Sequence, residues 1–370
     1  MKKALIILGV VVAISIGGYA LYRSFFSNTS YGSVNVNIGA LDEKAVSEMC
    51  KGASGHARIV CLAGELKKTL VDETLAKLQL SYSVADAQRW SNFPPAGYNN
   101  RVGLTLDKFT KEQLVIVKAI LKEATGTAAN EGYDEIEQIL NADDFLKANV
   151  PGDNAGFSSG NFHIAFIGTP SDTGTWQLYF GGHHLAVSNT YKDGKLIGAT
   201  PSFRGVEPFG SFTQNGRENN PMKQEQETFA AMLGALDENE QKTAMLGQTF
   251  TDIIAGPQKD KNFPSAPSGI RVGNLSREKQ ALVVKAIETY VGDIDDADSR
   301  VIMEKYKNES ADTYIAYSGT TGLNTVNDYV RIDGPSVWIE ISMQRAASWN
   351  GVHPHTVWRD KNTDYGGNLK

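Results

Sequence analysis

The residue types that most often bind metals or form covalent cross-links are scarce in this sequence. Its 370 residues include only two cysteines and six histidines. The cysteine patterns of iron–sulfur clusters and of covalently attached haem are absent. Because histidine is rare here, the places where it recurs are informative about function.

Basic charge is also in short supply. Lysine and arginine number 36 against 42 aspartates and glutamates, which gives a formal net charge of −6. This balance argues against a nucleic-acid-binding protein, because phosphate contacts need a concentrated basic surface. Long runs of like charge and low-complexity tracts are missing as well. The hydrophobic content of 41% is typical of a globular protein, and the length suffices for two domains or one duplicated unit.

The N-terminus differs from the rest of the chain. An apolar run from Ala4 to about Tyr22 follows two lysines. This pattern is typical of a signal peptide or a membrane anchor, and we assign residues 1–26 to it. The run is near the lower length limit of a spanning helix, and cleavage after Ala20 is an alternative, so both readings stay open. Either one predicts export to the periplasm or the cell exterior, with residues 27–40 as a linker.

The two cysteines are close in sequence. Ten residues separate Cys50 from Cys61. In an exported chain such a pair is expected to form a disulfide, because the compartment is oxidising. The alternative is two buried free thiols.

Short segments recur in the same order in the two halves of the chain. Such recurrence is typical of an internal duplication. We therefore predict an α+β fold with two pseudo-twofold-related repeats, residues 41–220 and 221–370. Each repeat is expected to be a helical region, with helices such as 110–124, followed by a small antiparallel sheet. The matched segments are residues 92–95 with 262–265, 101–103 with 271–273, 117–120 with 284–287, 163–169 with 314–320, 182–187 with 334–339, and 205–208 with 351–354.

Four of the six histidines occur in two pairs. His353 and His355 are one residue apart, so in a strand both side chains lie on the same face. His183 and His184 are adjacent, so in a regular strand their side chains lie on opposite faces and only one of them is expected to be a ligand. His184 would share a face with the small residues two and four positions after it. This favours His184 as a ligand and His183 as a packed or supporting residue.

A cleft between the repeats is expected to bring these histidines together. In the last matched segments Glu207 corresponds to His353, which makes it the best carboxylate to join them. Imidazoles and a carboxylate bind divalent transition metals, with zinc favoured and iron or copper as alternatives. The predicted ligands are His184, His353, His355, His183 and Glu207. In the competing interpretation the histidines hydrogen-bond backbone carbonyls and bind no metal.

Charged residues follow the second histidine pair. Asp360 or Glu207 is expected to accept or donate a proton during catalysis. A neighbouring carboxylate, Asp360 or Asp364, is expected to orient a ligand histidine. Arg359 has two readings, a clamp for a substrate carboxylate or phosphate and an ion pair that fixes the C-terminal tail.

Two motifs resemble those of domain-of-unknown-function family 3500, a set of bacterial and fungal proteins. The first is Gly-His-His-Leu at residues 182–185. The second is His-Pro-His-Thr-Val-Trp-Arg-Asp at 353–360, followed by Asp-Tyr-Gly at 364–366. The resemblance covers about residues 60–367 and leaves out the N-terminal segment and linker. The family name implies no activity, so the resemblance supports a site at these residues and leaves its chemistry open.

These observations together predict an exported, membrane-tethered, metal-dependent enzyme, with hydrolysis favoured. The expected partners are a small-molecule substrate and, through the N-terminal segment only, the membrane; nucleic acid is not expected. Iron or copper redox chemistry and a non-enzymatic metal- or ligand-binding protein are the alternatives. A purely structural role would instead predict a chain without metal. The sequence does not indicate the oligomeric state.

Overall fold

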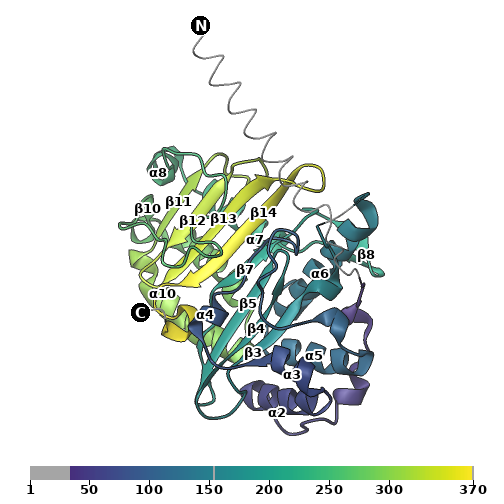
Figure 1. Ribbon diagram of the computed structural model, residues 1–370. Helices are drawn as coiled ribbons and strands as arrows, with labels where there is room; N and C mark the ends of the chain where they lie inside the picture. The colour runs from purple at the N-terminus through teal and green to yellow at the C-terminus, as the bar shows by residue number, and fades with distance from the viewer. Residues whose placement is uncertain (1–33, 153–154, 369–370) are drawn as a thin grey trace.

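The fold is known from a computed structural model that describes residues 34–152 and 155–368. The predicted signal or anchor at 1–26 lies outside the described residues, as does the first half of the 27–40 linker, residues 27–33. No helix among the described residues is long and apolar enough to cross a membrane. Figure 1 shows helices and loops arranged around one large twisted sheet.

The helices begin where the sequence supplies caps. At the start of α5, Thr110 and Gln113 each accept a hydrogen bond from the other's backbone N–H, and the apolar side chains of this helix are buried. The predicted helix over 110–124 is thereby confirmed. The α-helices are α2 (Gly55–Lys68), α3 (Asp72–Leu78), α4 (Val84–Ala87), α5 (Lys111–Glu123), α6 (Gly132–Asn149), α7 (Lys223–Gly234), α8 (Glu238–Ala244), α9 (Arg277–Val291) and α10 (Asp296–Glu309).

Short 3₁₀ segments connect these elements. They are η1 (Ile38–Ala40), η2 (Glu43–Val46), η3 (Leu106–Lys108), η4 (Ser159–Asn161), η5 (Val272–Asn274), η6 (Ser310–Asp312) and η7 (Asp364–Gly367).

Most strands belong to one mixed sheet of twelve strands, and β8 and β9 form a separate hairpin. The order along the sheet is β1-β3-β4-β5-β7-β14-β13-β12-β11-β10, with β2 beside β3 and β6 beside β5. The strands are β1 (Gln79–Leu80), β2 (Leu104–Thr105), β3 (His163–Ile167), β4 (Thr175–Gly182), β5 (Leu185–Lys192), β6 (Lys195–Gly198), β7 (Ser202–Gly205), β8 (Phe212–Gln214), β9 (Arg217–Asn219), β10 (Ile270–Arg271), β11 (Tyr314–Ser318), β12 (Tyr329–Asp333), β13 (Val337–Arg345) and β14 (Val352–Asp360).

The two faces of the sheet are covered differently. Helices α2, α5 and α6 pack on β3, β4 and β5, and helices α7, α9 and α10 pack on the same face of β11, β12 and β13. Loop segments around Trp90 and Ile253 cover the opposite face, where they contact Phe203 of β7 and Val357 of β14. His353 and His355 alternate with Val357 along β14, so they belong to the loop-covered face.

The predicted α+β class is confirmed, but the small antiparallel sheet expected in each half is not: strands of both halves belong to one large mixed sheet. Strand β7 of the first half pairs antiparallel with β14 of the second half, with Gly205 opposite His355 and Ser202 opposite Trp358. Joining the halves in this way removes two exposed strand edges, whose unpaired backbone groups would otherwise need another partner. The sheet is mixed rather than antiparallel because β1 pairs parallel with β3.

The cysteines form the predicted disulfide. Cys50, in the turn before α2, is bonded to Cys61 in that helix, and no cysteine is free. The bridge is compatible with an exported protein.

Candidate metal centre

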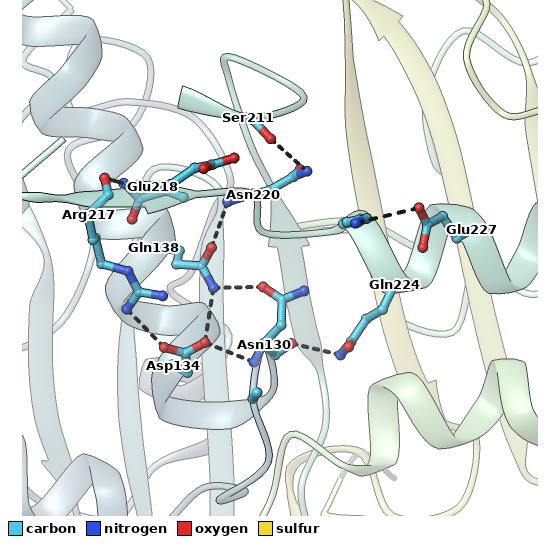
Figure 2. A pocket seen from close by; sticks show the side chains of 12 residues that line it. Asn130, Asp134, Gln138, Ser211, Arg217, Glu218, Asn220, Gln224 and Glu227 are labelled. Carbon is cyan, nitrogen blue, oxygen red and sulfur yellow. Dashed lines mark hydrogen bonds and ion pairs between the residues drawn. The ribbon is translucent and has the colours of Figure 1, made fainter. Parts of the chain in front are cut away.

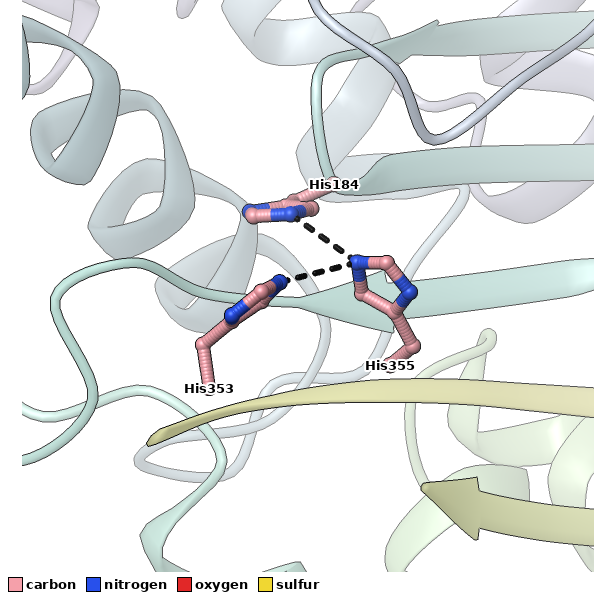
Figure 3. A group of neighbouring side chains, drawn as sticks. All are labelled: His184, His353 and His355. Atoms are coloured by element: carbon pink, nitrogen blue, oxygen red, sulfur yellow. Dashed lines mark hydrogen bonds between the residues drawn. The ribbon is translucent and has the colours of Figure 1, made fainter. Parts of the chain in front are cut away.

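Three histidines from distant parts of the chain meet where the two halves of the sheet join. His353 and His355 project from the first half of β14, and His184 lies in the tight turn between β4 and β5. Figure 3 shows the three rings turned toward one another, two of them from the yellow strand and one from the turn above it. All three side chains are buried. The predicted convergence of both histidine pairs on one place is confirmed for these three residues.

The ring nitrogens are close enough to share one ion. Nε2 of His355 lies 3.1 Å from Nε2 of His353 and 3.3 Å from Nε2 of His184. One ligand atom from each residue lies within 4.8 Å of the other two. Each nitrogen–nitrogen contact without an ion needs a proton on one side and a lone pair on the other. A divalent transition metal accepts a lone pair from every ring, so this donor set fits one.

The environment keeps the rings neutral, as metal ligands must be. Burial, together with the positive charge that the neighbouring histidines would carry, lowers the pKa of His184 well below its ordinary value. The same two causes lower the pKa of His353 to about 2. Both rings therefore present lone pairs at neutral pH.

Strand pairing brings the turn to the strand. The backbone N–H of Gly205, the last residue of β7, donates to the carbonyl of His184, and Gly205 lies opposite His355 on β14. A Cβ at position 205 would lie 2.8 Å from the Pro354 carbonyl oxygen and 3.2 Å from the His184 ring. Glycine is thus required for the close approach of the three segments.

His183 packs against the ring of His184. The pair lies in a turn, with His184 at φ 60°, so the expected alternation within a strand is wrong. The two rings stack at 3.7 Å between centroids, and Nδ1 of His183 lies 2.6 Å from Oδ1 of Asp143 on α6. His183 therefore stacks on His184 and does not belong to the group of three, and its predicted supporting role stays a prediction.

A loop that the sequence did not mark as part of the site covers the histidines. The carbonyl of Asn92 accepts from the backbone N–H of His184, and the Asn92 amide nitrogen lies 3.3 Å from Nδ1 of His355. Arg101, which is buried, donates to the carbonyls of Ser91 and Gly182 and so ties this loop to the turn. The only sequence signals were the recurrence of residues 92–95 at 262–265 and of residues 101–103 at 271–273.

Asp252 is the carboxylate beside His355. Its Oδ1 lies 3.2 Å from Nδ1 of His355, on the side of the ring away from the other two histidines. Gln344 of β13 lies next to both, with its amide nitrogen 2.5 Å from Asp252 Oδ1 and 2.6 Å from His355 Nδ1. The sequence had suggested Asp360 or Asp364 for this place. Nothing in the local pattern distinguishes Asp252 from other loop aspartates.

Glu207 is near the histidines in the chain but is held elsewhere. Its Oε1 accepts hydrogen bonds from the backbone N–H groups of Ser348, at 2.6 Å, and Trp349. The glutamate therefore fixes the loop that leads into β14, and it does not belong to the group of three histidines. Its predicted part as ligand or base stays a prediction.

Arg359 is completely buried and paired within the protein. Its guanidinium binds Asp364 at 2.9 Å and Asp260 at 2.7 Å, and it also donates to the carbonyls of Ala255 and Gly256. The ion pair with Asp364, one of the two expectations, is present. These contacts hold the loop that carries Asp252, while a substrate clamp stays a prediction.

Asp360 also has protein partners. Its Oδ2 accepts from Tyr306 at 2.8 Å and pairs with Lys305 at 2.7 Å, both on α10. It ends β14, whereas His353 and His355 begin it. At about 3.3 Å per residue a strand separates such positions by well over 10 Å. The structure thus does not bring Asp360 together with the histidines.

A serine-hydrolase reading finds no support at the one matching run. Residues 156–160 read Gly-Phe-Ser-Ser-Gly, the letters of a nucleophile elbow. The run lies between α6 and β3 rather than between a strand and a helix. The hydroxyl of Ser158 is buried and donates to the carbonyl of Val34 at 2.7 Å.

Two polar cavities lie away from the histidines. One, of about 490 Å³, is lined by α6, the β8–β9 hairpin and α7. Figure 2 shows its walls hydrogen-bonded to one another, as in the Arg217–Asp134 pair at 2.9 Å and the Gln138–Asn130 pair at 2.6 Å. The other, of about 560 Å³, lies beside β1 and contains Tyr82 and Ser171. Neither is lined by a histidine.

The family comparison covers the part of the chain that contains the three histidines. A family model described as "Protein of unknown function (DUF3500)" matches residues 53–367. The chain belongs to this family. The DUF3500 match includes His184, His353 and His355 and, of the two cysteines, Cys61 only. No curated protein and no solved structure matches the chain.

Proposed function

We propose that this DUF3500 protein is an exported, metal-dependent enzyme whose metal is held by His184, His353 and His355. The observation that carries the proposal is the convergence of three buried imidazole nitrogens within 4.8 Å. When bound, a zinc ion would supply Lewis acidity for hydrolysis, and iron or copper would supply redox chemistry. Zinc hydrolysis is the favoured form.

The number of ligands supports an enzyme over a structural metal site. Structural zinc sites are usually closed by four protein ligands, whereas catalytic sites keep three and leave a position for water or substrate. Among the described residues, three histidines form the group and no carboxylate joins them. A metal-handling protein without catalysis is the second candidate, since three ligands also suit a site that must release its ion.

Export rests on two features. The basic and apolar start of the chain suits a signal peptide or an anchor. The Cys50–Cys61 disulfide suits an oxidising compartment. We propose the periplasm or the cell exterior as the location, with tethering to the membrane if the N-terminal segment is retained.

Elemental analysis tests the proposal directly. The protein is purified without a metal-chelating tag, beside a His353→Ala/His355→Ala double variant. We expect near-stoichiometric zinc, iron or copper in the parent and its loss in the double variant. A His56→Ala variant is the matched control, since His56 pairs with Asp172 outside the group and its removal should leave the metal content unchanged.

Each outcome has a consequence. A parent that carries no metal, and binds none when it is offered, would refute the metal centre. A bound metal without hydrolytic or redox turnover on broad substrate panels would favour the metal-handling alternative. The identity of the metal selects the assays, because zinc supports hydrolysis and not electron transfer.

We also propose that the fold arose by internal duplication with a pseudo-twofold axis between β7 and β14. The strand order supports it, since β3-β4-β5-β7 is followed by β14-β13-β12-β11. A second similarity is that α6 contacts the β4–β5 turn through Asp143 and His183, and α10 contacts the β12–β13 turn through Glu309 and Ser336. Failure of the two halves to superpose in an experimental structure would contradict the proposal.

One matched pair of segments does not fit this axis. Gly205 is the last residue of β7, whereas residue 351 precedes the first residue of β14. If a twofold axis related the two strands, the first residues of β7 would correspond to the first residues of β14. The segments 205–208 and 351–354 are instead neighbours in space, because antiparallel pairing brings the end of β7 to the start of β14.

A further inference from the structure

The Nδ1 atom of His355 has three polar neighbours, one carboxylate and two amides, and they favour opposite tautomers of the ring. The carboxylate of Asp252 lies 3.2 Å away and the amide nitrogen of Gln344 lies 2.6 Å away. The amide nitrogen of Asn92 lies 3.3 Å away. A neutral imidazole carries one proton, either on Nδ1 or on Nε2. Its partner at Nδ1 therefore decides whether Nε2, which faces the other two histidines, has a free lone pair.

An acceptor and a donor at Nδ1 have opposite consequences. A carboxylate can only accept, so Asp252 stabilises the tautomer with the proton on Nδ1 and leaves Nε2 free to bind metal. An amide N–H can only donate, so Gln344 stabilises the tautomer with the proton on Nε2, which cannot bind metal. The Gln344 amide also donates to Asp252 at 2.5 Å, so this side chain contacts both the ring and the competing carboxylate.

We propose that Asp252 and Gln344 select the tautomer of His355, with Asp252 as the positioning residue that makes it a metal ligand and Gln344 as its competitor. The inference rests on the proposed metal centre and adds a control of that centre. Metal binding then requires the amide of Gln344 to leave Nδ1, while Asp252 keeps its contact.

The loop that carries Asp252 is fixed by buried groups of the sheet. Glu340 of β13, which is fully buried, accepts from the backbone N–H groups of Ile254 and Ala255 at 2.8 and 2.7 Å. Arg359 holds the carbonyl of Ala255 from the neighbouring strand. Asp252 itself is less constrained, with 40% of its side chain exposed, so solvent reaches the group next to His355.

Two substitutions separate the roles. Asp252→Asn removes the charge and keeps the size, and we expect metal affinity to fall ten- to a hundredfold, as for other supporting carboxylates. Gln344→Met removes the nearer of the two competing amide N–H groups, and we expect affinity equal to or higher than that of the parent. Affinity is measured by competition with a chromophoric chelator. Asp172→Asn is the matched control and should keep the metal affinity of the parent, since Asp172 pairs with His56, a histidine outside the group of three.

Long-range ¹H–¹⁵N NMR of the histidine rings reads the tautomer without metal. Asp252→Asn should increase the share of His355 protonated on Nε2, and Gln344→Met should increase the share protonated on Nδ1. Asp252→Glu should restore the behaviour of the parent if it reaches the ring. Shifts of both variants in the same direction, or no shift in either, would overturn the inference, because a merely structural role does not predict opposite signs.

The two proposals fail in different ways. A parent that binds no metal refutes the metal centre, and the NMR measurement still decides the tautomer assignment. Equal metal affinities of the parent and of the Asp252→Asn variant would refute the control by Asp252 and leave the metal centre intact. If Asp252→Asn does not fold, Gln344→Met alone still tests the opposite shift.

Discussion

At the scale of single residues, the centre depends on the glycine at position 205 as much as on the three histidine rings. Gly205 lets β7, β14 and the His183–His184 turn approach more closely than any other residue would allow. Histidine identity was visible in the sequence, but the need for glycine at 205 was not, since it arises from neighbours in the sheet.

Substituting Gly205 tests this dependence. We expect Gly205→Ala to weaken metal binding by about tenfold or more, because the new methyl group presses on the His184 ring. Overpacking should also lower the free energy of unfolding by about 1–3 kcal/mol. Chelator competition and urea unfolding measure the two effects. Gly247→Ala serves as the control, since a Cβ there meets no atom within 4 Å; equal affinities in the two variants would contradict the argument.

At the scale of elements, the N-terminal part of the described chain is attached to the sheet through α2. The Cys50–Cys61 bridge closes a short loop onto this helix, and Leu62 and Leu66 of α2 pack in the core beside α5. The bridge lies in the outer helical layer, away from β7 and β14. It therefore serves stability rather than the geometry of the histidines.

Removing the disulfide should separate stability from metal binding. For the Cys50→Ser/Cys61→Ser double variant we expect the free energy of unfolding to fall by about 2–3 kcal/mol, the range for a short loop. The metal content of the folded protein should stay that of the parent. Urea unfolding and elemental analysis on the same samples provide the measurements. Loss of metal from a folded double variant would show that α2 influences the centre.

At the scale of the whole molecule, the helical layer contains a carboxylate cluster between the halves, of which three members are buried and Glu131 is partly buried. Its members are Glu131, Glu135, Glu225 and Asp293, with Arg204 of β7 as the cation that binds Glu135 at 2.9 Å and Asp293 at 3.2 Å. Both carboxylate oxygens of Glu225 are buried without a hydrogen-bond partner. Burial raises the pKa of Glu225 well above its ordinary value, and burial and the charge of Asp293 raise the pKa of Glu131 to about 11.

These raised pKa values predict how stability depends on pH. A carboxyl whose pKa is higher folded than unfolded favours the folded state below the unfolded pKa of about 4.5, and this contribution is lost as pH rises toward the folded pKa. The free energy of unfolding should therefore fall from pH 5 to pH 9. Glu225→Gln, which cannot ionise, should reduce this slope by up to about 1.4 kcal/mol per pH unit.

Urea unfolding across this pH range measures the slope. Glu218→Gln on the exposed surface of β9 is the control and should leave it unchanged. An identical slope in Glu225→Gln and the parent would show that the cluster does not hold the extra proton.

Some of the site was predictable because it depends on local geometry alone. Alternation along a strand places His353 and His355 on one face whatever the rest of the fold does. His184 belongs to the group of three and His183 does not, but the reason given for choosing between them was wrong, since both lie in a turn rather than in a strand. Which of them binds a metal stays a prediction. Asp252 and Asn92 could not be found, because they reach His355 from positions 103 and 263 residues away.

The sequence by itself determined the capped helix at 110–124, the disulfide between its only two cysteines, and the shared face of His353 and His355. These follow from the helix and strand periods, from capping chemistry and from the scarcity of cysteine, all of which act over a few residues. Only the tertiary structure decided that β7 and β14 join two halves into one sheet and that His184 meets His355 across 171 residues. Strand register and packing depend on contacts between residues that are far apart in the chain, and no local sequence pattern specifies those contacts.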